Sequence, residues 1–498
     1  MKKNVIYLLC LTTLFFMGCE EEFLDKDPQG DFITQSQLSD AAALNPGLID
    51  GTLQGVYSTM ISTQTGGTTG HDDFGHKAYD LFSDFLSSDM ALSVSTYGWY
   101  RASITEMQCT EDFTFADNRQ VWQHYYTIIR AANTVIATLG GNDAEPELDA
   151  NKHILGQAFA LRAHSYFYLT QYFSNDYDPS AEILPLYLEA TNIGQAKEAT
   201  SVIYAQMELD LNRAIDLLST FNRPSKSAVN APVAKAILAY VIASTRDTSR
   251  LPEVVSLCND VIAESGASVM SSSEVLGGFN NVSTPGWIWG FDLTNEIGLN
   301  LVSWWGQVDA FSYSYAWAGD YKVIDQSLFD AIPANDVRKA QFFDSPANPR
   351  HLQPFFKFYS DQSNGNYGGA PQVTTSDYVF MRIAEMHLLK AESLAKMGQD
   401  GPARTALSDL LTQRLPDVTY LNSLSGEDLL DEIHLQTRIE LWGEGKAYLA
   451  MKRNQRCVTR GSNHLSFVGE TICPDEERFT FEIPEREIQF NVLINEQN

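Results

Sequence analysis

The sequence predicts a mainly α protein, in which tetratricopeptide-like helix pairs form a scaffold and a loop-rich, irregular region contains short strands. Several segments repeat apolar residues at steps of three and four, which is the period of an amphipathic helix. Residues 265–375 show little of this period and are rich in Gly, Ser, Asn and Trp. At 498 residues and 44% hydrophobic composition, the chain can bury a large core.

The predicted helices form three pairs followed by one long helix: 121–139 with 154–173, 202–218 with 231–244, 378–397 with 403–411, and then 429–453. In the first pair, Gly156, Ala160 and Ala163 form a stripe of small residues that lets a neighbouring helix approach closely. Gly398 ends one helix, and Pro402 begins the next, where a missing N–H is tolerated. Such pairs predict tetratricopeptide-like packing, although no strict repeat period is visible.

The last long helix has a predicted start signal of its own. Ser425 and Asp428 have the spacing of a capping box. Trp122 and Trp442 lie within predicted helices, and we interpret both as core residues.

The irregular stretch 265–375 contains a strand-like run at 287–291. Trp287 and Trp289 alternate along this run, so one of them is expected to face inward. Unstructured segments of this length within a compact protein are usually functional. We therefore expect this insertion to contribute to a binding surface.

The N-terminus is typical of a lipoprotein signal peptide at residues 1–18. Lys2 and Lys3 precede an apolar run at 5–17 that is too short to span a bilayer comfortably. Phe16, Met17, Gly18 and Cys19 then resemble a lipobox, so Cys19 is the expected lipidation site. The alternatives are an uncleaved anchor and an ordinary signal peptide.

Three acids follow the predicted lipidation site: Glu20, Glu21 and Glu22. They resemble the export signal of surface-exposed lipoproteins in the Bacteroidetes. A solvated tether is the alternative, and both interpretations can hold together.

The chain is strongly acidic. Its formal net charge is −29, and it becomes −31 without residues 1–18, which carry two lysines and no acid. Such a charge repels phosphate backbones, which argues against nucleic acid as a partner. No later apolar run reaches the length of a membrane helix, so the lipid is the only expected anchor.

Four cysteines remain outside the signal peptide and the lipidation site: Cys109, Cys258, Cys457 and Cys473. None has C-x-x-C spacing, so zinc and thioredoxin-type chemistry find no support. Cys457 and Cys473 are joined by a loop containing Gly, Ser and Asn, and they are the pair we would connect if a disulfide forms. Spacing alone leaves that question open.

Two aromatic stretches are candidate carbohydrate sites, because sugar rings stack on flat apolar faces beside polar groups. The first is STYGWYR and the second is WWGQVDAFSYSYAW, which includes Gln307 and Asp309. A single aromatic residue is more often buried in the core than exposed. Clustering of aromatic residues in polar loops favours exposure. The candidate ligand residues are Tyr97, Trp99, Tyr100, Trp304, Trp305, Tyr313, Tyr315 and Trp317.

His71, Asp72, Asp73 and His76 offer imidazoles and carboxylates close together, as a metal site would. Structural hydrogen bonding of a turn is the favoured interpretation, and we expect no metal and no cofactor. The chain has no G-x-S-x-G, phosphate-loop or dinucleotide motif. We therefore expect a protein that is not an enzyme.

Four segments together resemble the SusD/RagB family of outer-membrane nutrient-binding lipoproteins: FLDKDPQGDF, YVFMRIAEMHLLKAESLAKMG, QTRIELWGEGKAYLAMKRNQR and FTFEIPEREIQFN. The resemblance runs through nearly the whole mature chain. It implies a single domain at 19–498 with four tetratricopeptide-like units, its helical scaffold at about 40–264 and 376–498, and the loop-rich insertion at about 265–375. Within the third segment, the motif of Arg438, Glu440, Gly443 and Glu444 is expected to be structural, as a buried ion pair or cap near the last long helix.

The family resemblance also implies a function. A non-catalytic protein of the outer membrane, lipid-anchored and exposed at the cell surface, would capture oligosaccharide or polysaccharide and deliver it to a SusC-like TonB-dependent transporter. Two alternatives remain: a surface lipoprotein glycoside hydrolase, and a peptide-binding or interaction scaffold of the same complex. The sequence does not name the glycan.

Overall fold

The computed structural model describes residues 37, 41, 45–372 and 374–498. The predicted signal peptide, the lipidation site Cys19 and the acids Glu20 to Glu22 lie outside these residues. Within the described part of the chain, no helix combines the length and the apolar character needed to cross a membrane.

The protein is mainly α-helical, as predicted. The longer helices are α3 (Gly47–Ile61), α4 (His76–Leu86), α5 (Ala116–Thr138), α6 (Asp149–Tyr172), α7 (Thr200–Leu217), α8 (Ala231–Ser244), α9 (Leu251–Glu264), α13 (Ile383–Lys396), α14 (Asp400–Leu411), α15 (Gly426–Glu440) and α16 (Lys446–Asn454). Short helices are α10 (Trp304–Val308), α11 (Tyr315–Ala318), α12 (Gln326–Ala331) and α17 (Glu485–Phe490). A π-helical turn at Arg101–Thr105 and several 3₁₀ turns complete the helical structure.

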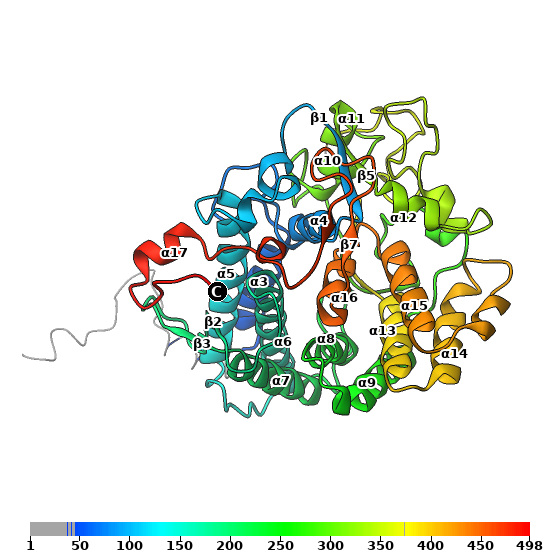
Figure 1. Cartoon of the computed structure of the whole chain (residues 1–498). Helices are drawn as coiled ribbons and strands as arrows, with labels where there is room; N and C mark the ends of the chain where they lie inside the picture. Colours follow the sequence, from blue (N-terminus) through cyan, green and yellow to red (C-terminus); the bar gives the residue numbers. More distant parts are fainter. Residues whose placement is uncertain (1–36, 38–40, 42–44, 373) are drawn as a thin grey trace, which may run out of the picture.

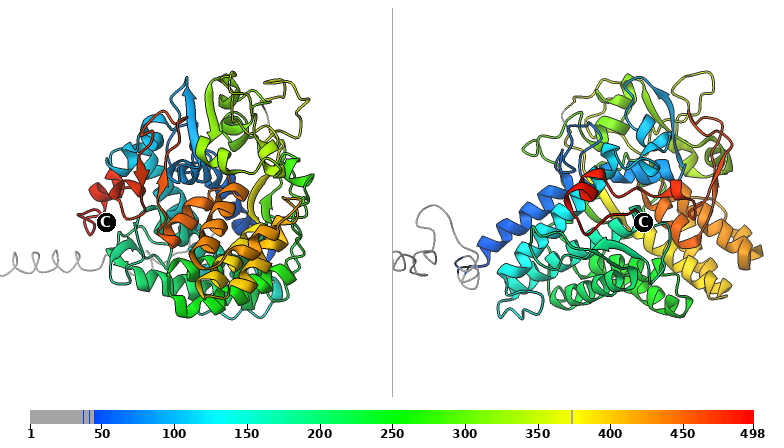
Figure 2. Two further views of the ribbon diagram at one scale, coloured as in Figure 1. Left: turned by 45° about the vertical axis from the view of Figure 1, so that its right-hand side comes forward. Right: turned by 60° about the vertical axis from the view of Figure 1, so that its left-hand side comes forward.

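Consecutive helices pack side by side and form a continuous scaffold. α3 packs on α5, the helices α5 to α9 each pack on the next one, and α9 packs on α13, which also contacts α14 and α15. Figure 1 shows these helices as an arc along the lower half of the molecule. In both views of Figure 2 the insertion and β1 lie above this arc.

The described strands form four small antiparallel sheets of two strands each. They are β1 (Met90–Ser95) with β5 (Asp320–Ile324), β2 (Glu182–Pro185) with β3 (Lys197–Ala199), β4 (Trp287–Phe291) with β6 (Tyr378–Arg382), and β7 (Val458–Thr459) with β8 (Thr471–Ile472). Two of these sheets attach the insertion to the scaffold, since β4 and β5 belong to the insertion and their partners lie outside it.

The period of apolar residues predicted the limits of most helices to within a few residues, and the predicted helix 231–244 has the same limits as α8. The predicted helix 378–397 is wrong in its first turn, because residues 378–382 form β6 and pair with β4. That pairing buries β4 and β6 along their whole length, so Trp287 and Trp289 are both in the core, rather than one of them.

The predicted long helix 429–453 is in fact two helices, α15 and α16. Gly443 and Gly445 separate them with φ angles of 78° and 71°, a region that glycine enters without strain. A side chain at Gly443 would meet the ring of Phe358 at 2.4 Å. The predicted capping box is also wrong, because Ser425 occupies the N-cap position but its side chain makes no capping hydrogen bond.

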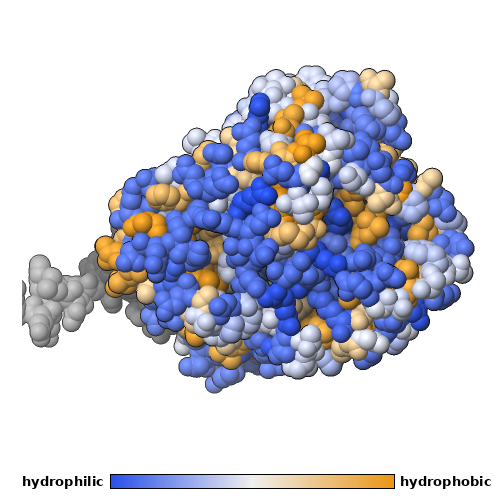
Figure 3. Space-filling view, viewed as in Figure 1, coloured by the Kyte–Doolittle hydropathy of each residue, from blue (hydrophilic) through white to orange (hydrophobic). Residues whose placement is uncertain are grey.

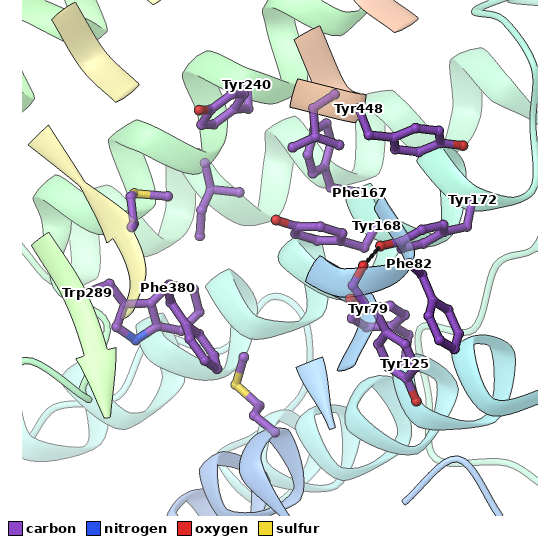
Figure 4. Close-up of a cluster of buried hydrophobic side chains, with 14 of the residues drawn as sticks. Tyr79, Phe82, Tyr125, Phe167, Tyr168, Tyr172, Tyr240, Trp289, Phe380 and Tyr448 are labelled. Carbon is purple, nitrogen blue, oxygen red and sulfur yellow. Dashed lines mark hydrogen bonds between the residues drawn. The ribbon is translucent and has the colours of Figure 1, made fainter. Parts of the chain in front are cut away.

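The core of the scaffold is unusually aromatic, as Figure 4 shows. Tyr172 on α6 stacks on Phe481 with ring centroids 5.5 Å apart, and it stacks on Tyr448 of α16 at 5.8 Å. Its hydroxyl donates a hydrogen bond to the backbone oxygen of Tyr79 at 2.6 Å. These contacts join the first helices of the chain to the last. Trp122 and Trp442 are buried, as predicted.

A buried ion cluster connects the insertion to the C-terminal helices. Glu440 accepts hydrogen bonds from Arg338, Arg382 and Arg414, and Glu444 accepts from Arg382 and pairs with Lys357 at 2.9 Å. All of these side chains are almost completely buried. The expected buried ion pair of this motif is therefore confirmed at Glu440 and Glu444, and Arg438 of the same motif pairs with Asp89 at 2.6 Å.

The disulfide that the sequence left open is present. Cys457 and Cys473 are bonded, and the two-stranded sheet of β7 and β8 lies directly beside the bond. Cys109 and Cys258 are free and buried.

Candidate functional site

The pairing of β1 with β5 brings the two predicted aromatic stretches together. In this antiparallel sheet Ser95 is opposite Asp320, so the loop after β1 meets the residues just before β5. The Asp320 carboxylate accepts hydrogen bonds from the backbone N–H groups of Thr96 and Tyr97 at 2.6 and 2.8 Å. Figure 1 shows β1, β5 and α11 together at the top of the molecule, away from the arc of scaffold helices.

The rings of His71, Tyr97, Trp99 and Tyr315 form one contiguous surface, which we call the aromatic platform. Trp99 stacks on His71 with centroids 5.3 Å apart and planes only 4° from parallel. Tyr315 meets Tyr97 and Trp99 edge-on at 5.3 and 5.9 Å. Tyr97 is 57% exposed and Tyr315 only 7% exposed, so Tyr315 supports the more exposed rings.

Hydrogen bonds fix the supporting rings of the platform. The Tyr315 hydroxyl and the Nδ1 atom of His71 are hydrogen-bonded at 2.7 Å. The partial burial of Tyr315 raises the pKa of its phenol, which keeps the group neutral at physiological pH. A platform held in this way loses little side-chain entropy when a ligand is bound.

A second pair of predicted residues, Tyr313 and Trp317, lies at α11: Tyr313 precedes the helix and Trp317 is part of it. Tyr313 is 51% exposed and Trp317 is half-buried, with ring centroids 5.4 Å apart. Trp317 packs against Gly368, where a Cβ atom would lie 2.1 Å from the indole nitrogen. The backbone of α11 is set by Ser314, whose hydroxyl accepts a hydrogen bond from the N–H of Trp317.

Three of the predicted ligand residues, Tyr100, Trp304 and Trp305, are buried and cannot contact a ligand from solvent. Tyr100 has a φ of 65°, and its ring turns inward toward Phe82 and Phe85. These three residues are therefore removed from the candidate site.

The two tryptophans belong to α10, which is buried along its whole length. Trp305 donates its indole N–H to the backbone oxygen of Ser376 at 2.6 Å. Trp304 packs edge-on against Phe358, and the Lys77 ammonium lies 4.2 Å from its ring centroid.

The polar residues interleaved with the second aromatic stretch, Gln307 and Asp309, are also buried, and Gln307 supports the platform through the backbone of His71. Gln307 donates to the backbone oxygen of His71 and accepts from the Lys322 ammonium, both at 2.8 Å. Asp309 accepts from the backbone N–H groups of Phe311 and Ser360. Burial raises the pKa of Asp309 to about 6 and lowers the pKa of Lys322 to about 8.

The candidate metal residues do not converge. His71 belongs to the platform. Asp73 accepts hydrogen bonds from the backbone N–H groups of Gly66 and Thr68, and this agrees with the interpretation that these polar residues hydrogen-bond within a turn. His76 lies on α4 in the core, where burial holds its pKa well below the usual value. Among the described residues, no group of three or more His, Cys, Asp or Glu side chains could hold a metal ion.

Sequence reasoning missed the role of His71 in the platform, since it assigned this residue to a turn. The signal that could have found it is weak, because the contact with Trp99 depends on how two loops fold together. Tyr97 and Tyr313, which are exposed, were named as candidates from the composition of their loops, but the sequence did not say which aromatic residues are exposed.

The fold and this surface define a helical-repeat scaffold that carries an aromatic platform open to solvent. Two family profiles match the chain: one described as "Starch-binding associating with outer membrane" over residues 23–238, and one described as "SusD family" over residues 344–485. The chain belongs to the SusD/RagB family.

Individual relatives are distant in sequence. The chain is 21% identical to SusD-like protein P25 of Formosa agariphila, over 59% of this chain and 52% of P25, so the match spans only about half of that relative. It is 23% identical to SusD-like protein P38 of the same organism, over 68% of this chain and 72% of P38.

Solved structures resemble this chain more closely in fold than in sequence. A SusD-like carbohydrate binding protein from Bacteroides vulgatus has a TM-score of 0.75 at 24% identity, covering 90% of this chain and 97% of the other. Surface glycan-binding protein A from Bacteroides thetaiotaomicron, in complex with laminarihexaose, has a TM-score of 0.67 at 14% identity, covering 90% and 98%.

Proposed function

We propose that this protein binds a glycan on the aromatic platform and does not catalyse its cleavage. The observation that carries the proposal is the ring surface of the exposed Tyr97 and the half-buried Trp99, which Tyr315 and His71 hold in place. The C–H faces of pyranose rings stack on such surfaces, and the phenol and imidazole groups offer hydrogen-bond partners for sugar hydroxyls.

The family supports this assignment. One matching profile is described as starch-binding, and a fold neighbour is a surface glycan-binding protein in complex with laminarihexaose. Sequence identity to that neighbour is only 14%, so the identity of the glycan is not transferred. Laminarihexaose is a reasonable first ligand for testing, within a panel of plant, algal and host polysaccharides.

The decisive experiment is affinity gel electrophoresis against this panel, followed by calorimetry with oligosaccharides of the retarding polymer. We expect Trp99→Ala to weaken binding by about tenfold, or about 1.4 kcal/mol, because a stacking face is lost. The matched control is Tyr420→Ala, which removes an exposed tyrosine on the 3₁₀ turn Thr419–Ser423 of the scaffold. Equal affinities for the two variants would refute binding at the platform.

The alternative of a glycoside hydrolase needs two accessible carboxyl groups beside the sugar. The carboxylates built into the platform region, Asp320 and Asp309, are buried and already accept backbone N–H groups. Release of reducing ends from the bound polysaccharide by the pure protein would establish the hydrolase in place of a binding protein.

We further propose that the bound glycan passes to a SusC-like TonB-dependent transporter and that the protein is held at the outer surface by a lipid on Cys19. The family profile described as associating with the outer membrane supports this location. Co-purification of a SusC-like transporter with the tagged protein from its own cells, after mild detergent extraction, tests the pairing. Recovery of the tagged protein alone, with both proteins expressed, would contradict it.

A further inference from the structure

A second cavity, which shares no lining residue with the platform, lies between α5, the segment that follows β2, and α17. Its volume is about 600 Å³, which is within the range of ~300–1,000 Å³ for small-molecule sites. Six side chains that line it carry the argument: Arg119, Trp122, Tyr126, Arg130, Tyr187 and Arg486. We call this cavity the arginine pocket.

The wall of the arginine pocket is aromatic and held in place. Trp122 and Tyr126 have ring centroids 4.9 Å apart, and Tyr126 meets Tyr187 edge-on at 5.7 Å. Trp122 donates its indole N–H to Glu487 at 3.2 Å, and the Tyr126 hydroxyl donates to the backbone oxygen of Pro185 at 2.9 Å. These bonds fix the rings before any ligand arrives.

The charge of the arginine pocket opposes that of the whole chain. Arg119, Arg130 and Arg486 line it with two acids, Glu189 and Glu487, in a protein of net charge −29. Glu487 already accepts hydrogen bonds from Trp122 and from the side-chain amide of Asn491. The pocket therefore has a locally positive charge on an otherwise acidic protein.

The three guanidinium groups retain free donors. Within the described part of the chain none of the three forms an ion pair, in contrast to the arginines of the buried cluster around Glu440. Arg119 donates to the backbone oxygen of Gly67 and Arg130 to the side chain of Asn192. Each guanidinium has five N–H donors, so most of them stay available for an anion.

The mouth of the pocket is apolar. Phe490, at the end of α17, is 77% exposed, and the Arg486 guanidinium lies 5.9 Å from its ring centroid. Val492 and Leu493 are exposed just beyond it. Figure 3 shows hydrophobic surface over α17 at the left of the molecule. A ligand at this site therefore meets flat apolar faces and cationic groups together.

We propose that the arginine pocket binds an acidic sugar, a hexuronate residue of an oligosaccharide. The C–H face of the pyranose would stack on Tyr126 or Tyr187, its carboxylate would pair with Arg130 or Arg486, and the amide of Gln123 would reach its hydroxyls. An acidic peptide would satisfy the guanidiniums but would leave these ring faces without a matching partner. The site is independent of the platform, so its failure leaves the proposed function standing.

The test is calorimetry and saturation-transfer NMR with trigalacturonate, using the neutral galactotriose as the matched probe. We expect saturable binding of the uronate only, weakened by about tenfold in Arg486→Gln and in Arg130→Gln, as for the loss of a charge-assisted hydrogen bond. Arg456→Gln, at the mouth of a different cavity between α15 and α16, is the control and should leave affinity unchanged. Thermal melting of each variant checks that it is folded.

Several results would overturn the assignment. Absent binding, equal binding of the neutral trisaccharide, or unchanged affinity in both arginine variants would each exclude an acidic-sugar site here. Loss of uronate binding in Trp99→Ala alone would place the anion on the platform. Tighter binding of a polyglutamate peptide than of trigalacturonate would reassign the pocket to peptide.

Discussion

Tyr315 shows how a nearly buried residue can shape a binding surface. Its ring supports Tyr97 and Trp99, and its hydroxyl is hydrogen-bonded to His71. The exposed rings would make the contacts with sugar, whereas Tyr315 would set their positions. Such a residue changes affinity through its neighbours.

The first prediction concerns this hydroxyl. Tyr315→Phe keeps the ring contacts but leaves His71 without its partner, so its imidazole gains rotational freedom. We expect glycan affinity to fall by about three- to fivefold, less than for Trp99→Ala, with a loss of ~0.5–1.5 kcal/mol in the free energy of unfolding. Calorimetry and urea denaturation measure the two quantities. An affinity equal to that of the unmodified protein would show that the hydrogen bond does not position the platform.

Asp117, in the first turn of α5, gives a second prediction at this scale. Burial and the nearby Asp72 raise its pKa to about 7, so the folded protein holds a proton that the unfolded chain releases near pH 4. The stability gained by holding this proton is complete below about pH 4 and is lost as pH rises to about 7. Asp117→Asn cannot lose a proton, so we expect it to become more stable relative to the unmodified protein across this window.

Chemical denaturation of both proteins at pH 4.5, 6 and 8 measures that difference. A constant difference in unfolding free energy at all three values would mean that Asp117 does not titrate differently in the folded protein. Asp50, an exposed acid in the first turn of α3, provides the control substitution Asp50→Asn.

At the scale of elements, the buried cluster around Glu440 attaches the insertion to the scaffold. Arg338 and Lys357 come from the insertion, Arg382 from the end of β6, and Glu440 from the end of α15. Removing one partner of a buried ion pair leaves uncompensated charge, which costs more than the pair contributes. The attachment of the insertion to the scaffold therefore depends on buried charges that come from several parts of the chain.

The third prediction follows from this arrangement. Glu440→Ala leaves three guanidiniums facing one another, and we expect a loss of ~3–5 kcal/mol in the free energy of unfolding. Glu427→Ala, on the same helix, removes an exposed carboxylate paired with Arg456 and serves as the control, with an unchanged unfolding midpoint expected. Similar midpoints for the two variants would show that the cluster contributes no net stability.

The same cluster predicts that the protein loses stability at low pH. Burial alone would raise the pKa of Glu440 and Glu444, but the guanidiniums of Arg414, Arg382 and Arg338 and the Lys357 ammonium outweigh it. The pKa of Glu440 is held well below its usual value and that of Glu444 at about 2. This stability is therefore complete above about pH 4.5 and is lost as pH falls toward 2.

At the scale of the whole molecule, the proposed lipid on Cys19 would tie this acidic protein to a membrane through one end. The fourth prediction is that Cys19→Ala moves the protein from the detergent phase to the aqueous phase in a Triton X-114 partition, because the acyl chains are lost. The ligand sites lie on the folded body, so glycan affinity should not change. Retention of the variant in the detergent phase would indicate a different anchor.

The long amphipathic helices could be predicted from sequence because their apolar period is local and sustained. The first turn of the predicted helix 378–397 could not be predicted correctly. Its aromatic and β-branched residues form strand β6 because they pair with a strand about ninety residues earlier in the chain. The break between α15 and α16 was missed for a similar reason. Gly443 is required there because Phe358, from the insertion, approaches its backbone.

The candidate site was predictable as a pair of aromatic stretches but not as a set of exposed rings. Tyr97 and Trp305 look alike in composition and context, yet one is exposed and the other donates its indole N–H to Ser376 in the core. The arginine pocket was not predicted, because its walls come from α5 and from the C-terminal residues near α17.

By itself, the sequence determined the helical class of the protein, its acidic surface and the two loops rich in aromatic residues, because each of these is a property of composition or of local period. The tertiary structure alone decided which rings face solvent, which loops meet across β1 and β5, and where unpaired arginines gather. The reason is that exposure and proximity are set by neighbours distant in the chain, and no local pattern records them.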